Sequence, residues 1–104
     1  MKALSFAALA AFLALAGSAR AEDTVIEIEN FTFNPAEVTV KPGTTVTWKN
    51  ADDIPHSVVE TDTKFRSKPL DTGESFSMTF TEAGEVGYFC GLHPHMKGKI
   101  IVKP

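Results

Sequence analysis

The feature that most constrains the fold is a series of short segments in which apolar and polar residues alternate. Alternation with a period of two places every second side chain on one face, which is typical of a β-strand with one buried face. No stretch after residue 21 keeps the 3.6-residue period of an amphipathic helix. Turn residues such as Pro42 and Gly43 separate the segments. We therefore predict strands over 24–29, 37–40, 44–50, 56–60, 75–80, 85–90 and 98–102.

The number and spacing of these segments favour a single all-β domain. Seven or so short strands separated by turns are typical of an antiparallel β-sandwich. The stretch 64–72 is less regular, and we expect it to form a loop that crosses between strands. Trp48, Phe76 and Phe80 occupy apolar positions of their strands, so we expect them in the core.

The first 21 residues have the pattern of a secretory signal peptide. Lys2 precedes an apolar run over residues 3–16, and Ala19-Arg20-Ala21 has the small-x-small form of a cleavage site. The run is shorter than a membrane-spanning helix requires, which favours a cleaved signal over a membrane anchor. We therefore expect a signal peptide over 1–21, a mature domain over 22–104 without a membrane span, and export to the periplasm.

The mature domain is acidic. All 13 acidic residues but only 8 of the 10 basic residues follow residue 21, so the domain carries a formal net charge of −5. No cluster of basic residues is present, which excludes nucleic acid as an expected partner. The acidity suits a soluble monomer that is steered toward a basic patch on another protein.

A short stretch near the end of the chain concentrates metal-binding side chains. Residues 90–96 include the only cysteine, Cys90, together with His93 and Met96. One thiolate and two imidazoles with a weak axial methionine form the ligand set of a blue-copper electron-transfer site. The second imidazole is available from His56, which opens an expected strand far upstream. We predict that His56, Cys90, His93 and Met96 bind one type 1 copper ion.

Other interpretations of these residues fit less well. Structural zinc sites generally use two to four cysteines, and a thioether is a soft ligand suited to copper. Cys90 alone could be an inert buried thiol, but His93 and Met96 lie beside it in the sequence and are further candidate metal ligands. A nucleophile and base pair of Cys90 and His93 lacks a third residue or an oxyanion hole, so we do not expect an enzyme. His95 is expected to face solvent beside the site.

The chain resembles the cupredoxins, with a short ligand loop of the amicyanin type. The resemblance extends over the whole mature chain and rests on FTFNP at 31–35, VKPG at 40–43, VTWKN at 46–50, PHSV at 55–58 and CxxHxxM at 90–96. It implies an eight-stranded Greek-key β-sandwich with His56, Cys90 and His93 in the trigonal plane of the copper and Met96 on its axis. It also implies that Asn50 forms hydrogen bonds across the ligand strands. Gly91-Leu92 and His95 depart from the amicyanin pattern.

Two functions follow from this site. The first is a one-electron shuttle between redox partners, a dehydrogenase or a c-type cytochrome, that dock near His93. The apolar residues expected around that histidine are Ile54, Pro55, Leu92 and Pro94. The alternative is a periplasmic copper-binding or delivery protein without a redox partner. The resemblance to amicyanins implies methylamine dehydrogenase as a partner, but the departures lie in the loop that would dock and leave the partner open.

Overall fold

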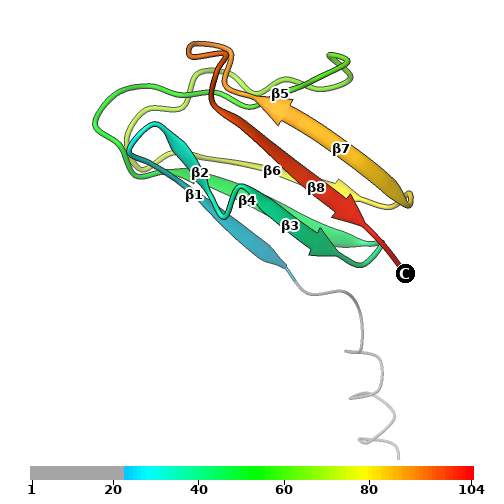
Figure 1. The fold of residues 1–104 in the computed structure, drawn as a ribbon. Coiled ribbons are helices and arrows are strands. Elements are labelled where there is room, and N and C mark those ends of the chain that lie inside the picture. The colour runs from blue at the N-terminus through cyan, green and yellow to red at the C-terminus, as the bar shows by residue number, and fades with distance from the viewer. Residues whose placement is uncertain (1–22) are drawn as a thin grey trace, which may run out of the picture.

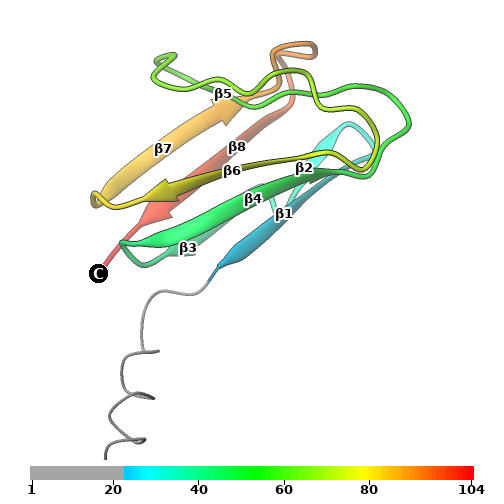
Figure 2. The same ribbon diagram turned by 180° about the vertical axis from the view of Figure 1, so that it is seen from behind.

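The computed structural model describes residues 23–104 and shows two four-stranded sheets packed face to face (Figures 1 and 2). The strand order is β2-β1-β4-β6 in one sheet and β3-β8-β7-β5 in the other. The strands are β1 (Thr24–Glu29), β2 (Thr32–Asn34), β3 (Glu37–Val40), β4 (Thr44–Asn50), β5 (Val59–Glu60), β6 (Ser75–Phe80), β7 (Gly84–Phe89) and β8 (Lys97–Val102).

The inward faces of the two sheets form one apolar core. Trp48 and Tyr88 are its largest fully buried side chains, and their rings meet edge to face with centroids 5.2 Å apart. Phe80 is buried and Phe76 packs against the cluster, so the predicted core positions are confirmed. Trp48 comes from the first sheet and Tyr88 from the second. Their contact therefore joins the two layers.

The predicted β-sandwich is confirmed, and most predicted strands occur at or within one residue of their expected bounds. The range 56–60 is an exception, because only Val59 and Glu60 form a strand. His56 instead makes a single bridge to Leu70, and the Val58 amide donates a hydrogen bond to the Ser67 hydroxyl. The backbone upstream of β5 thus pairs with the 64–72 loop. Alternation also missed β2, which has only three residues.

The prediction of an antiparallel sandwich is wrong for two strand pairs. β1 pairs with β4, and β3 pairs with β8, in parallel. Between β1 and β4 the chain crosses to the other sheet, where it forms β3. It then returns to the first sheet, and β4 runs beside β1 in the same direction as β1. Alternation of side chains reports which face is buried but carries no information on strand direction, so it could not reveal this mixed arrangement.

The connections that carry the metal-binding side chains lie at one end of the sandwich (Figure 1). The segment 51–58 follows β4, and the connection 90–96 joins β7 to β8. The predicted signal peptide over 1–21 lies outside the described residues. Within the described part of the chain, no helix is long and apolar enough to span a membrane.

We predict that Gly98→Ala destabilises the sandwich. A methyl group at position 98 would overlap the ring and hydroxyl of buried Tyr88, which cannot move without disturbing the core. Overpacking of this kind costs about 1–3 kcal/mol. The matched control is Gly87→Ala on the adjacent strand, where a Cβ would meet mainly the Thr61 hydroxyl at 2.9 Å, which can rotate away. Urea denaturation should show a clearly larger loss for Gly98→Ala, and equal losses would contradict this packing.

Candidate metal centre

Cys90 follows the last residue of β7 and begins a tightly closed loop. Its amide donates a hydrogen bond to the Met96 carbonyl at 3.0 Å, so the two ends of the loop are held together. Inside the loop, the His93 amide donates to the Cys90 carbonyl at 3.2 Å, and the Met96 amide donates to the His93 carbonyl at 2.9 Å. These three bonds fix the backbone between the cysteine and the methionine at a small cost in loop-closure entropy.

His56 reaches the site from the segment between β4 and β5. Its amide and carbonyl pair with the carbonyl and amide of Leu70, and its side chain is fully buried. The backbone pairing fixes the position of His56 outside a regular strand. Cys90 is also fully buried, whereas His93 is only partly buried.

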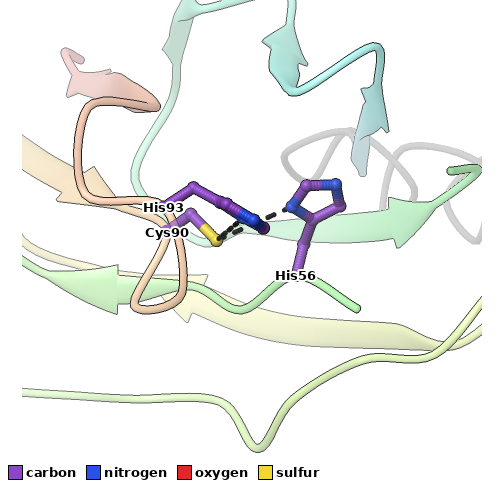
Figure 3. A group of neighbouring side chains, drawn as sticks. All are labelled: His56, Cys90 and His93. Atoms are coloured by element: carbon purple, nitrogen blue, oxygen red, sulfur yellow. Dashed lines mark hydrogen bonds between the residues drawn. The ribbon is translucent and has the colours of Figure 1, made fainter. Parts of the chain in front are cut away.

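The three donor atoms converge on one point (Figure 3). The Nδ1 atoms of His56 and His93 each lie 3.7 Å from the Cys90 Sγ, and all three donor atoms lie within 4.8 Å of one another. First-row metals bind nitrogen and sulfur donors at roughly 2.0–2.3 Å. The spacing therefore leaves room for one ion bonded to all three atoms, and a thiolate with two imidazoles is a donor set that suits copper.

The carboxylate of Asp52 sets the orientation of His56. Its Oδ2 lies 2.8 Å from His56 Nε2, on the side of the ring away from Cys90. When Nε2 carries the ring proton, it donates a hydrogen bond to the carboxylate. Nδ1 is then unprotonated and presents its lone pair toward the Cys90 sulfur. Carboxylate partners of this kind fix the tautomer of metal-binding histidines. The sequence analysis missed Asp52, because a single acidic residue four positions before a histidine has no distinctive pattern.

The pKa of Asp52 is lowered relative to an ordinary aspartate. Burial by itself would raise it, but the Phe31 and Asn30 amides and the His56 ring all donate to the carboxylate and stabilise its charged form. The net effect keeps Asp52 ionised and able to accept these hydrogen bonds.

Ser57 connects the His56 segment to the Cys90 loop. Its amide lies 3.4 Å from the Cys90 Sγ, and its hydroxyl accepts a hydrogen bond from the Gly91 amide at 2.9 Å. The amide therefore supports the thiolate while the side chain holds the residue that follows it. The sequence analysis did not identify this role, because serine is common in loops and the two segments are far apart in the chain.

Asn50 has a more local role than the resemblance implied. Its Nδ2 donates to the carbonyls of Ile54 and Leu70 at 2.8 and 2.9 Å, and its Oδ1 accepts from the Asp52 amide at 2.9 Å. These bonds shape the segment before His56 and its Leu70 partner. Within residues 23–104, no hydrogen bond of the Asn50 side chain reaches the Cys90 loop, so Ser57 provides the link between the ligand segments.

Met96 and His95 complete the description of the loop. Met96 is buried in the core cluster, and His95 is exposed as expected. The axial role of Met96 stays a prediction.

Comparisons with known proteins agree with this geometry. A family model described as a cupredoxin-like domain matches residues 2–102. Amicyanin of Paracoccus versutus is 38% identical over 88 residues, which cover 80% of this chain and 67% of that protein. Amicyanin-alpha of Methylorubrum extorquens is 36% identical over an alignment of 124 positions, which covers 99% of this chain and all of that protein. The oxidised P94A mutant of amicyanin superposes with a TM-score of 0.74 and 34% identity, over 78% of this chain and 82% of that one.

The sandwich and its buried thiolate–imidazole cluster define a small β-protein with a copper centre at one end. The chain belongs to the cupredoxin family, and its relatives include the amicyanins. Its cofactor is one type 1 copper ion, for which the cluster of His56, Cys90 and His93 is suited. Like its amicyanin and plastocyanin relatives, the protein is an electron carrier and not an enzyme.

We predict that Ser57→Ala weakens copper binding. The substitution removes the acceptor of the Gly91 amide while keeping the backbone donor to Cys90. Loss of groups that orient metal ligands typically lowers affinity by about 10–100-fold. Competition with a chelator should show this loss for Ser57→Ala. Ser77→Ala, which removes a hydroxyl pair on the outer face of the sandwich, serves as the control. Equal affinity in the two variants would rule out a supporting role for Ser57.

Proposed function

We propose that the protein is a periplasmic one-electron carrier in which His56, Cys90, His93 and Met96 bind the copper ion and redox partners dock over His93. The observation that carries the proposal is the graded burial of the cluster. His56 and Cys90 are fully buried, while His93 is partly exposed on its loop. One ligand therefore offers a route between the copper and the surface, and the others keep the site away from water.

The chain's own residues hold the donors in place. When bound, the copper ion supplies reversible cycling between Cu(II) and Cu(I). Asp52 holds the His56 ring, and Ser57 holds the thiolate and the residue after it. The closed 90–96 loop keeps His93 and Met96 near Cys90. A site held from several sides moves little when the charge of the ion changes, which favours fast electron transfer.

The surface around His93 suits a brief encounter with another protein. Leu92 is 48% exposed, Pro55 and Pro94 are exposed, and Ile54 is partly exposed. Small apolar contact areas are typical of weak redox complexes. The net charge of −5 on residues 22–104 would steer the domain toward a basic partner. A dehydrogenase or a c-type cytochrome with such a patch is the class of partner that we propose.

Copper delivery is the alternative function, and the burial of the ligands supports it less well. Transfer of copper to a receiver requires that incoming ligands reach the ion. Cys90 and His56 are fully covered, which leaves His93 as the accessible side. Slow exchange is expected from such a site, as an electron carrier requires.

Export to the periplasm rests on the sequence pattern of residues 1–21. Removal of this segment as a signal peptide would leave the domain 22–104. A free thiol in an oxidising compartment is prone to oxidation. In this fold Cys90 is buried and positioned for a metal, so the single cysteine is compatible with that compartment.

The proposed ligand set is tested by adding copper to the metal-free protein. We expect one equivalent of Cu(II) to produce an intense visible band from thiolate-to-copper charge transfer. Cys90→Ala should abolish the band, whereas Met96→Leu should keep a coloured site and raise the reduction potential, because a weak axial ligand tunes the metal. Weak absorption in the parent protein would exclude a type 1 site. Loss of copper in Met96→Leu would show that Met96 is more than a weak axial ligand.

The docking surface is tested by Leu92→Lys. A positive charge on the rim would face the basic patch of the partner and should slow electron transfer to a c-type cytochrome by roughly tenfold, equivalent to about 1.4 kcal/mol, without changing the visible spectrum. Val25→Lys introduces the same charge at a residue that is 55% exposed on β1 and is the control. Stopped-flow mixing gives both rates. Equal rates in the two variants would place docking elsewhere.

A further inference from the structure

The turn between β1 and β2 holds an aromatic residue in a backbone conformation that it disfavours. Asn30 and Phe31 both have a φ of +57°, and they lie between Glu29 and Thr32, which are paired in the hairpin. Positive φ at both central residues is the pattern of a type I′ turn, whose preferred sequence is Asn-Gly. Asn30 suits this turn, whereas a bulky residue at position 31 is an outlier. Strained residues that persist in a fold point to a function.

The strained turn is held by the same carboxylate that orients His56. Asp52 Oδ1 accepts a hydrogen bond from the Asn30 amide at 2.7 Å, and Oδ2 accepts one from the Phe31 amide at 3.0 Å. Oδ2 also lies 2.8 Å from His56 Nε2. The position of Phe31 is therefore tied to the position of a metal-binding side chain.

The Phe31 ring contacts both imidazoles of the cluster. Its centroid lies 5.5 Å from that of His56 at an interplanar angle of 90°, and 5.1 Å from that of His93 at 86°. Edge-to-face contacts of this kind are favourable arrangements of aromatic rings. Phe31 is 47% exposed, so one side of the ring meets the histidines while the rest faces solvent. The ring thus covers part of the histidine pair.

The two histidines differ in what else holds them. His56 is fixed by the Asp52 carboxylate on one side and faces Cys90 on the other. In the part of the chain that the structure describes, the one polar contact of the His93 ring is that of Nδ1 with the Cys90 Sγ at 3.7 Å. Phe31 therefore supplies a restraint on the His93 ring beyond its single hydrogen bond to Cys90.

We propose that Phe31 is a positioning residue of the copper site, an aromatic cap that holds the His93 imidazole and limits its release from the metal. A glycine at position 31 would relieve the backbone strain of the turn, but it would leave the His93 ring without this support. The proposal rests on the ligand set of the proposed function, since it concerns how one of those ligands is held.

The test is Phe31→Gly, because this substitution is expected to favour the turn but to weaken the metal site. Glycine suits positive φ, so the metal-free variant should be as stable to urea as the parent or more stable. Copper affinity should nevertheless fall roughly 10–100-fold, with faster release to excess chelator, as is typical when a supporting group of a metal site is lost. NMR relaxation measurements on the His93 ring carbons of the metal-free variant should show more motion than in the metal-free parent.

Two further variants serve as controls. Phe31→Tyr keeps an aromatic ring and should behave like the parent, and Val25→Ala is the control for loss of an exposed apolar side chain on β1.

Each result decides the proposal. Parental copper release together with an unchanged His93 ring in Phe31→Gly would overturn it and leave Phe31 as a surface residue. A destabilised metal-free variant would also overturn it, because Phe31 would then be ordinary core packing. If the parent protein lacks the charge-transfer band, the proposed function fails, but the ring motion in the metal-free variants still tests whether Phe31 restrains His93.

Discussion

The carboxylate of Asp52 joins the β1–β2 turn, which is distant in sequence, to the segment that carries His56, and the arrangement of the site depends on it. It accepts hydrogen bonds from the two amides of the β1–β2 turn and lies against the outer nitrogen of His56. The amide of Asp52 is itself held by Asn50 at the end of β4. Asp52, itself held at the end of β4, therefore fixes the position of the His56 side chain and of the turn that covers it. A carboxylate can do this because it accepts several hydrogen bonds at once.

The second constraint is that the ligands come from separate segments that must keep a fixed separation. Ser57 and the His56–Leu70 bridge hold one segment, and the closed loop from Cys90 to Met96 holds the other. Beneath them, the contact of Trp48 with Tyr88 joins the two sheets. The buried aromatic pair lets the sheets act as a stiff support. The exposed side of the site is the side on which partly buried His93 lies.

Much of this could be predicted from residue types and spacing. Alternation identified the long strands of the sandwich, because a half-buried strand shows its period directly in the sequence. The chemistry of Cys90, with histidines and a methionine nearby, indicated copper before any geometry was known. Parallel pairing and the short β2 strand could not be inferred, because alternation has no direction and three residues hold too little pattern. The supporting residues were also missed: Ser57 and Phe31 act through contacts with residues far along the chain, and a single acidic residue such as Asp52, four positions before a histidine, has no distinctive pattern.

The central claim is that the donor atoms are oriented by the protein before any metal binds. Its most direct test is a long-range proton–nitrogen NMR spectrum of His56 in the metal-free protein. The Asp52 contact predicts the tautomer with the proton on Nε2, a slowly exchanging Nε2 proton, and an unprotonated Nδ1 that faces Cys90. A proton found on Nδ1, or a ring that exchanges between tautomers, would contradict the claim and show that the metal itself organises the site.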